Sequence, residues 1–109
     1  NGTLGQDLIS RLSLFDALSV IPADRSVLDL SQPVDILCRL LDQHQPHVII
    51  NAGAFTGVDL AESERDEAMK VNARAPEALA KWCQHNDGYL LHISTDYVFD
   101  GQKGEAYTP

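Results

Sequence analysis

Apolar residues recur along this chain in two ways that predict different elements. A spacing near 3.6 residues predicts amphipathic helices over residues 4–15, 34–41 and 68–82. Asn72 interrupts the apolar stripe of the last of these helices, and we expect its side chain to hydrogen-bond a neighbouring loop or strand. Pro76 lies within the same helix, where a proline removes a backbone donor and can kink the chain.

Continuous apolar runs between the helices predict strands. They cover residues 17–21, 27–30, 48–50 and 90–93, the second being brief. The run at 48–50 is apolar on both faces, which is typical of a parallel strand covered by helices. The alternation of strands and helices predicts an α/β fold with a Rossmann-like, doubly wound parallel sheet.

Two glycines three residues apart, Gly2 and Gly5, stand where the first predicted helix begins. This pattern is typical of the end of a dinucleotide-binding loop, whose backbone N–H groups approach a pyrophosphate, although a plain glycine-rich turn is the alternative. Such a loop needs a preceding strand and a further glycine. We therefore expect a truncated sheet, in which residues 1–109 form a partial NAD(P)-binding Rossmann domain without its first strand and its C-terminal substrate region. The missing strand would be central, so we expect the isolated chain not to fold stably.

A charged pair, Asp24 and Arg25, follows about 20 residues beyond Gly5, where a dinucleotide-binding unit carries its ribose-reading residue. An acid there accepts hydrogen bonds from the ribose hydroxyls and favours NAD. An arginine there pairs with a 2′-phosphate and favours NADP. The dipeptide offers both, so the preference between the two cofactors stays open, and a solvated turn is an equal alternative.

Two of the apolar runs end abruptly in small or polar residues. The run at 90–93 leads into residues 94–97, Ser-Thr-Asp-Tyr, and the run at 48–50 leads into residues 51–54, Asn-Ala-Gly-Ala. Ligands of open α/β sheets bind outside the carboxyl ends of the strands, so both segments are predicted to face a bound molecule. Asn51 either caps its segment or touches the ligand.

Composition narrows the range of partners. The formal net charge is −8 without a concentrated basic face, which argues against nucleic acid and anionic membranes as partners. Cys38 and Cys83 have no CxxC spacing, which predicts reduced core thiols of a cytoplasmic protein. The histidines lack metal-ligand spacing, so we expect no metal site, and His92 is predicted to be a hydrogen-bonded core residue. The acidic run at 62–67 is typical of a solvated helix start.

Four segments, residues 51–56, 58–62, 71–72 and 94–101, together resemble the dTDP-4-dehydrorhamnose reductases of the extended short-chain dehydrogenase/reductase superfamily. The string Ser-Thr-Asp-Tyr-Val-Phe-Asp-Gly with the upstream Val-Asp-x-Ala-Glu is specific to these reductases and close relatives. The resemblance implies an oxidoreductase that uses NADPH or NADH to reduce the 4-keto group of dTDP-6-deoxy-L-lyxo-4-hexulose, which gives dTDP-L-rhamnose for polysaccharide biosynthesis.

The same resemblance implies a role for individual residues. Thr95 matches the catalytic hydroxyl that hydrogen-bonds the substrate oxygen, and Tyr97 matches a residue at the nicotinamide and substrate end. The implied contacts of the rest of the cofactor are Gly2, Thr3, Leu4, Gly5, Asp29, Leu30, Ala52, Gly53, Ala54 and Thr56. The family's proton-donating Tyr and the Lys four residues after it are not found in these 109 residues. We therefore expect no turnover by this chain alone, with the pair just beyond Pro109.

Two other functions fit the same segments. One is a non-catalytic NADP-binding regulatory subunit like that of methionine adenosyltransferase, which shares the Asp-Tyr-Val-Phe-Asp-Gly string. The other is an epimerase or dehydratase of another nucleotide sugar from the same superfamily. The expected partners of the reductase are a nucleotide-sugar substrate and, in the full-length protein, a second copy in a homodimer.

Overall fold

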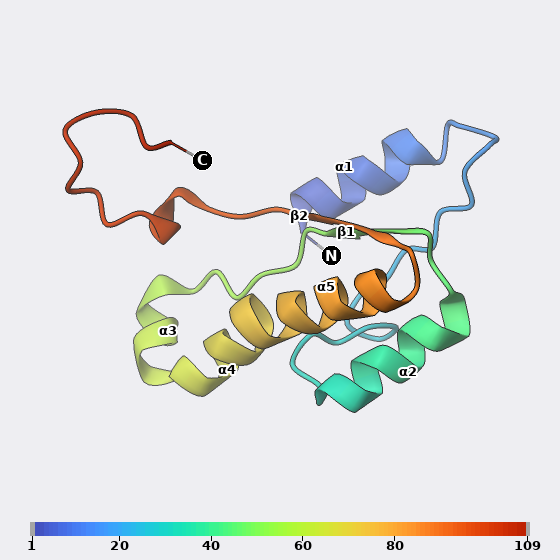
Figure 1. The fold of residues 1–109 in the computed structure, drawn as a ribbon, viewed down its shortest axis with the longest axis horizontal. Helices are drawn as coiled ribbons and strands as arrows, with labels where there is room; N and C mark the ends of the chain where they lie inside the picture. Colours follow the sequence, from blue (N-terminus) through green and yellow to red (C-terminus); the bar gives the residue numbers. More distant parts are fainter. Residues whose placement is uncertain (1, 109) are drawn as a thin grey trace.

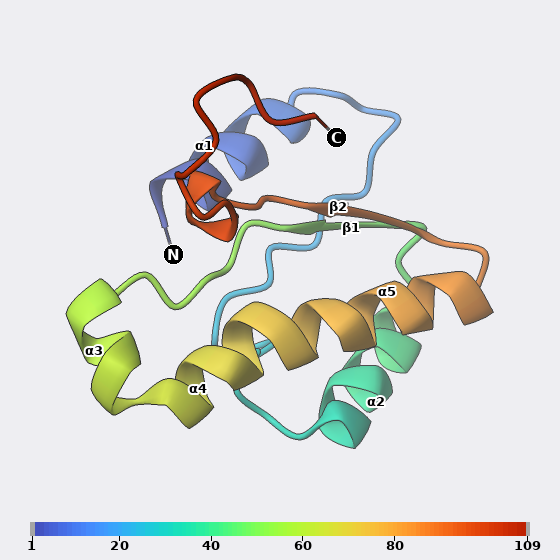
Figure 2. The ribbon, with the colours of Figure 1, turned by 60° about the vertical axis from the view of Figure 1, so that its left-hand side comes forward.

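A computed structural model describes residues 2–108 of the chain, with the side chains of Val58 and Tyr97 outside the described part. In chain order its elements are α1 (Thr3–Leu12), α2 (Val34–His44), β1 (Val48–Asn51), α3 (Val58–Ser63), α4 (Arg65–Met69), the π-helical turn η1 (Lys70–Arg74), α5 (Ala75–His85), β2 (Tyr89–His92) and the 3₁₀ turn η2 (Asp96–Val98). The strands β1 and β2 pair in parallel, with Val48 opposite Tyr89 and Asn51 opposite His92. α1 lies over one face of this sheet, and α2 and α5 lie over the other (Figures 1 and 2). The parallel pairing through a helical crossover confirms the predicted α/β class.

The core lies between the sheet and the helices α2 and α5. Leu79 is 1% exposed and packs with Leu41, Trp82 and Cys83, and Leu90 of β2 packs against this cluster from the sheet. Leu41, Leu79 and Trp82 come from the helical stripes predicted at 34–41 and 68–82, because residues three and four apart share one face of a helix. The indole Nε1 of Trp82 donates a hydrogen bond of 2.8 Å to Oδ1 of Asp42 in α2, so the two helices are also joined by a polar contact.

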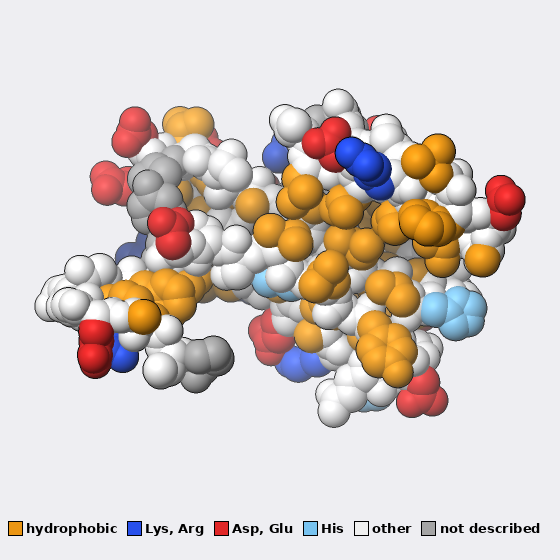
Figure 3. Space-filling model, turned by 90° about the horizontal axis from the view of Figure 1, so that it is seen from above, with side chains coloured by type: hydrophobic (Ala, Val, Ile, Leu, Met, Phe, Trp, Pro, Cys, Tyr) orange, Lys and Arg blue, Asp and Glu red, His pale blue; other side chains and the backbone are white. Residues whose placement is uncertain are grey.

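The opposite face of the sheet is much less covered than the sequence predicts. No residue of α1 is buried. Val48 is 56% exposed and Leu91 is 53% exposed, so the expectation that the strand at 48–50 is buried on both faces is wrong. Figure 3 shows hydrophobic side chains gathered on the face of the molecule that carries α1. A single helix that buries none of its residues cannot remove this apolar surface from water.

The strands predicted at residues 17–21 and 27–30 do not form. The first run begins in a turn, in which the Leu18 amide donates to the Phe15 carbonyl at 3.0 Å, and continues without strand pairing. The second lies at a turn in which the Leu28 amide donates to the Asp24 carbonyl at 2.8 Å. A parallel strand needs a neighbour that pairs its backbone N–H and C=O groups. Within the described residues the sheet consists of β1 and β2 alone, so neither run has a strand beside it.

The long helix predicted over residues 68–82 is divided by a change in its hydrogen bonding. In η1 the Ala75 amide donates to the Lys70 carbonyl, five residues back. Pro76 follows at the start of α5, and its ring would clash with the carbonyl four residues before it, that of Asn72, in a regular helix. The wider π turn accommodates the proline, so the kink expected at Pro76 takes the form of a π turn ahead of it.

The two thiols agree with their prediction, while the first helix is shorter than predicted. Cys83 is buried, Cys38 is half-buried, and both are free. Burial raises the pKa of the Cys83 thiol, which keeps it protonated and unreactive. α1 ends at Leu12, and Phe15 lies beyond it with 60% of its surface exposed. No helix in the described part of the chain has the length and apolar character needed to cross a bilayer.

We expect the 109-residue chain, produced by itself, to lack a cooperative unfolding transition. Its core is small, and large apolar side chains such as Leu91 and Phe15 remain exposed, so little free energy offsets the conformational entropy of folding. Trp82 is the single tryptophan and lies in the core, which makes its fluorescence a direct probe. Emission typical of a solvent-exposed indole is expected. A blue-shifted emission lost in one sharp thermal transition would contradict this.

Candidate functional site

Three segments far apart in the sequence meet at one edge of the sheet. β1 and β2 run in parallel, so residues 52–57 and residues 93–98 leave the sheet at the same edge. The first turn of α1 lies near this edge in both ribbon views (Figures 1 and 2). This is the place where open α/β sheets bind ligands, and the structure brings near it the start of α1, with Gly2 and Gly5, and the segment with Thr95.

Asn51 joins the ends of the two strands. Its side chain is 5% exposed, and its Oδ1 accepts a hydrogen bond of 3.0 Å from the Gly53 amide. Its Nδ2 lies 3.2 Å from Nδ1 of His92. Since Nδ2 can only donate, Nδ1 of His92 is the acceptor and the ring carries its proton on Nε2. Asn51 therefore caps the loop after β1. His92 is hydrogen-bonded as predicted, but it is exposed rather than in the core.

Asp24 and Asp29 both form local turns with a serine two residues later. Oδ1 of Asp24 accepts from Oγ of Ser26 at 2.5 Å and from its amide at 2.8 Å. Oδ1 of Asp29 accepts from the amide of Ser31 at 3.0 Å and from its Oγ at 2.9 Å. The Ser26 hydroxyl and the Ser31 amide are the main causes that lower the pKa of the two carboxyls below the usual 3.8. A lowered folded-state pKa favours the turns at pH above about 3.8, and this contribution disappears as the pH falls through the folded-state pKa.

The turn after Asp29 packs directly on the loop after β1. A Cβ atom on Gly53 would lie 2.8 Å from Cδ1 of Leu30, closer than such atoms approach. A side chain at residue 53 would therefore displace the end of the Leu30 side chain, and the glycine leaves room for the present contact between the two segments. Leu30 and Gly53, both implied cofactor contacts, are brought together.

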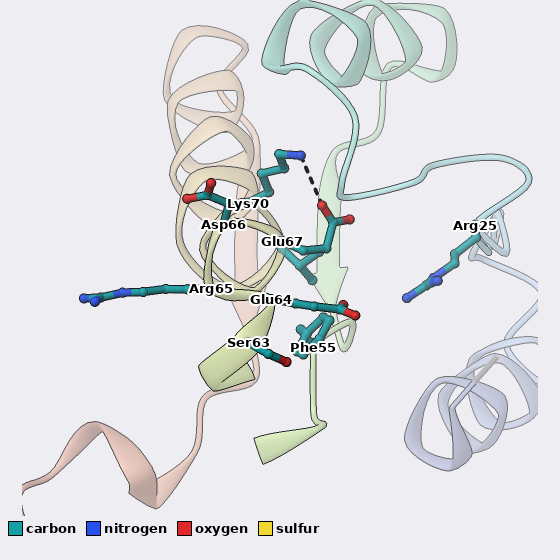
Figure 4. A pocket seen from close by; sticks show the side chains of 9 residues that line it. Arg25, Phe55, Ser63, Glu64, Arg65, Asp66, Glu67 and Lys70 are labelled. Carbon is teal, nitrogen blue, oxygen red and sulfur yellow. Dashed lines mark hydrogen bonds and ion pairs between the residues drawn. The ribbon is translucent and has the colours of Figure 1, made fainter. Parts of the chain in front are cut away.

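A cavity of about 720 Å³ opens between the turn with Arg25 and the helices α3 and α4. Its lining residues are Arg25, Phe55, Ser63, Glu64, Arg65, Asp66, Glu67, Lys70 and Val71. In Figure 4 the Arg25 side chain points across the cavity toward Glu64 and Phe55, whereas Arg65 points away from Arg25. Nζ of Lys70 forms an ion pair of 3.1 Å with Oε2 of Glu67.

The predicted solvated helix start at residues 62–67 is confirmed in part, because residues 62–66 are exposed and Asp66 and Glu67 lie in the first turn of α4. The segment is broken at Glu64 (φ −111°, ψ 44°) between α3 and α4, and Glu67 is half-buried in its ion pair with Lys70. The sequence pattern gave no signal that Glu64 and Glu67 face Arg25, because the facing segments are about 40 residues apart. Among the described residues, no group of three or more His, Cys, Asp or Glu side chains is arranged to hold a metal ion.

Thr95 lies in the exposed segment that follows β2. The Ile93 amide donates to the Asn51 carbonyl at 3.0 Å and extends the pairing just past the strand. Oγ1 of Thr95 donates to Oδ1 of Asp96 at 3.1 Å, at the start of η2. The backbone of Tyr97 belongs to η2, and its side chain lies outside the described residues. The predicted placement of Thr95 beyond the carboxyl end of a strand is confirmed.

The segment after η2 is held by its own side chains. The Tyr107 hydroxyl donates to Oδ1 of Asp100 at 2.6 Å, and the rings of Tyr107 and Phe99 stack with centroids 4.4 Å apart. The Tyr107 hydroxyl and, next, the Gln102 amide lower the pKa of the Asp100 carboxyl. The second half of the Ser-Thr-Asp-Tyr-Val-Phe-Asp-Gly string therefore builds a local loop.

The start of α1 is accessible to a ligand. Gly2 precedes the helix in an extended conformation, and a Cβ atom on Gly2 or Gly5 would meet no heavy atom within 4 Å. The first turn carries no acidic residue. Backbone N–H groups at a helix start attract anions, so this end of α1 has the properties needed for a pyrophosphate.

Comparison with models of protein families matches residues 1–109 to the RmlD substrate binding domain. The chain belongs to this family. Similar RmlD-family proteins include the dTDP-4-dehydrorhamnose reductases of Aggregatibacter actinomycetemcomitans, 41% identical over 97% of this chain, and Burkholderia thailandensis, 39% identical over 98%. This chain spans about a third of their lengths, 36% and 35%.

Solved structures of RmlD-family proteins have the same fold. The dTDP-4-dehydrorhamnose reductase of Bacillus anthracis in complex with NADP has a TM-score of 0.81 and 35% identity, over 98% of this chain and 38% of that one. A hypothetical dTDP-4-dehydrorhamnose reductase of Sulfolobus tokodaii has a TM-score of 0.78 and 36% identity, over 97% of this chain and 40% of that one. The resemblance inferred from the sequence motifs, and the Rossmann-like fold, are thus confirmed.

Proposed function

We propose that this chain is the cofactor-binding part of an NADPH-dependent reductase that acts on a dTDP-4-keto-6-deoxy sugar. The observation that carries the proposal is the convergence of the α1 start, the loop after β1 and the Thr95 segment at one edge of a parallel sheet. We propose that the chain is part of a longer protein, the complete reductase. We propose that it works in the cytoplasm as a homodimer.

The substrate is proposed from the names of the relatives. Several similar curated proteins are dTDP-4-dehydrorhamnose reductases, and a protein of Streptomyces niveus, 34% identical over 97% of this chain, is a dTDP-4-keto-6-deoxy-D-glucose reductase. These names share a dTDP group and a 4-keto-6-deoxy sugar. The first choice for this chain is dTDP-6-deoxy-L-lyxo-4-hexulose, the substrate implied by its motifs.

The described residues fit a dinucleotide. The first turn of α1, from Thr3 to Gly5, offers unobstructed backbone N–H groups for the pyrophosphate. Residues 52–54 provide small side chains along the strand end, and the turn with Leu30 packs on them through Gly53. Arg25 extends into the neighbouring cavity, where its guanidinium can pair with a 2′-phosphate. The Asp24 carboxylate is engaged by Ser26, so this geometry favours NADPH over NADH.

In the proposed reaction the nicotinamide supplies a hydride to the carbonyl carbon of the sugar, and the carbonyl oxygen takes up a proton. Thr95 would donate a hydrogen bond to that oxygen and stabilise the negative charge that develops on it. The family's Tyr would deliver the proton, and its Lys would lower the pKa of the Tyr. These two residues are proposed to follow Pro109 in the complete reductase.

The first experiment is to sequence the source DNA on both sides of the region that encodes this chain and to express the complete reading frame. NADPH oxidation is then followed with the dTDP-4-keto sugar, and the product is analysed. Formation of dTDP-L-rhamnose is expected. Cofactor binding without oxidation would overturn the reductase and favour the non-catalytic regulatory subunit, and an epimerised or dehydrated product would favour the other members of the superfamily.

Replacing Arg25 with alanine is expected to raise the KM for NADPH of the complete reductase about 10- to 100-fold, while the KM for NADH changes little. A hydrogen-bonded charge pair contributes about 1.5–3 kcal/mol, and NADH has no phosphate for Arg25 to bind. Steady-state kinetics with both cofactors measure the effect. Arg65→Ala is the matched control, because Arg65 lines the same cavity but points away from Arg25 (Figure 4). Equal losses with NADPH and NADH would contradict the assignment.

A further inference from the structure

The carboxylate of Glu64 faces the guanidinium of Arg25 across the cavity between the Arg25 turn and α4. The two side chains point toward one another in Figure 4. Both residues are exposed, and neither forms an ion pair or a side-chain hydrogen bond with another described residue. Both charges are therefore available to a ligand that enters the cavity.

The other charged side chains of this cavity are paired or turned away. Nζ of Lys70 lies 3.1 Å from Oε2 of Glu67, so these two charges offset each other. Arg65 and Asp66 lie on the side of the helix away from Arg25 (Figure 4). A ligand between the turn and α4 would thus meet one cation and one anion, the two side chains that face each other.

The wall that carries Glu64 is tied to the ligand-binding edge of the sheet. α4 continues into η1, where Oδ1 of Asn72 accepts from the Phe55 amide at 2.8 Å and its Nδ2 donates to the Phe55 carbonyl at 3.0 Å. The hydrogen bond to a neighbouring loop that the sequence predicts for Asn72 is thus confirmed. Phe55 belongs to the loop after β1 and lines the same cavity. The fold therefore sets the position of Glu64 relative to a ligand at this edge.

A carboxylate in this position distinguishes between the two nicotinamide cofactors. The 2′-phosphate of NADPH is negatively charged, so Glu64 would repel it and would compete with it for the Arg25 guanidinium. NADH has a neutral hydroxyl at the same place and meets no such repulsion. An unfavourable contact with one of two ligands is a common source of specificity. Because both side chains are exposed, water and salt screen the effect, and we expect it to be modest.

We propose that Glu64 is a specificity-determining residue, which weakens the binding of NADP(H) and so narrows the preference of the complete reductase for NADPH over NADH. This inference rests on the proposed function, because it takes Arg25 to bind the 2′-phosphate. Arg25 attracts the phosphate and Glu64 limits the gain. Removal of the carboxylate should strengthen the binding of one cofactor and leave the other unaffected.

The test is calorimetric titration of the complete reductase with NADP⁺ and with NAD⁺. Glu64→Gln keeps the size of the side chain and removes its charge. It is expected to lower the Kd for NADP⁺ about three- to tenfold, as for the loss of one screened charge beside a phosphate dianion. The Kd for NAD⁺ is expected to stay unchanged. General destabilisation would affect both cofactors alike, so the ratio of the two Kd values is the readout.

Two further variants control the experiment. Asp66→Asn is the matched control, because it removes the same charge from the lining of the same cavity, on the side away from Arg25 (Figure 4). It is expected to leave the ratio of the two Kd values unchanged. Glu64→Ser is a second way to remove the charge. Glu64 is the N-cap of α4, a position that favours serine, so this variant serves if Glu64→Gln fails to fold.

The outcomes separate this inference from the proposed function. Failure of the unsubstituted complete reductase to bind NADP⁺ would overturn the proposed function and the inference with it. Normal binding with an unchanged ratio for Glu64→Gln, or an equal change of the ratio for Asp66→Asn, would overturn the inference alone. Tighter binding of NADP⁺ but not of NAD⁺ by the Glu64 variants, with no such change for Asp66→Asn, would support it.

Discussion

Replacing Thr95 with valine is expected to lower kcat of the complete reductase about 100-fold or more, with little change in the KM for NADPH. Thr95 lies in the exposed segment beyond the carboxyl end of β2, where its hydroxyl can reach a ligand at the edge of the sheet. Loss of one donor to a developing oxyanion lowers kcat about 10²- to 10³-fold. Valine has nearly the same shape as threonine, so the change removes the hydroxyl and little else.

Two further variants control this prediction. Thr95→Ser keeps a hydroxyl and is expected to recover most of the activity. Thr108→Val makes the same replacement at an exposed threonine beyond the loop closed by Tyr107, and it is expected to be neutral. Steady-state measurements at saturating NADPH report kcat. An unchanged kcat for Thr95→Val would exclude Thr95 from the reacting centre.

Truncation of Leu79 to alanine is expected to destabilise the complete reductase by about 2–5 kcal/mol. Leu79 is 1% exposed at the centre of the cluster that joins α2, α5 and the sheet, so its loss leaves a cavity among Leu41, Trp82 and Cys83. The lowered free energy of unfolding is measured by urea denaturation, followed by far-UV circular dichroism.

The matched control is Leu14→Ala, which removes the same atoms from a side chain that is 77% exposed. Its effect is expected to remain within about 0.5 kcal/mol. Similar effects of the two substitutions would contradict the position of the core between the sheet and the helices α2 and α5.

The spacing of apolar residues correctly predicted those helices and strands that pack or pair with another element in the described chain. The apolar stripe of residues 34–41 became α2, and the runs at 48–50 and 90–93 became the paired strands, because each buries one face against another. The run at 17–21 is also mostly apolar, but no strand lies beside it among the described residues and it stays unpaired. An apolar run predicts a strand only as far as a neighbour can supply hydrogen bonds.

Parts of the candidate site were beyond any local pattern. Leu30 packs on Gly53, and Arg25 and Glu64 line one cavity, although the two residues of each pair are more than 20 residues apart in the sequence. From the sequence, the segment that carries Glu64, residues 62–67, is predicted only to be a solvated helix start. Contacts of this kind depend on the path of the chain in three dimensions, which hydrophobic periodicity does not report.

By itself, the sequence determined the α/β class, the two strands that pair, the family motifs and the position of Thr95 beyond a strand end, because these follow from short-range patterns. Only the tertiary structure decided which residues meet. It brought the Asn72 side chain, in a π turn, to the Phe55 backbone, and it placed Arg25 and Glu64 around one cavity. It also left residues 17–21 without a neighbouring strand among the described residues. The physical reason is that periodicity defines the face that an element buries, whereas packing selects the neighbour against which it is buried.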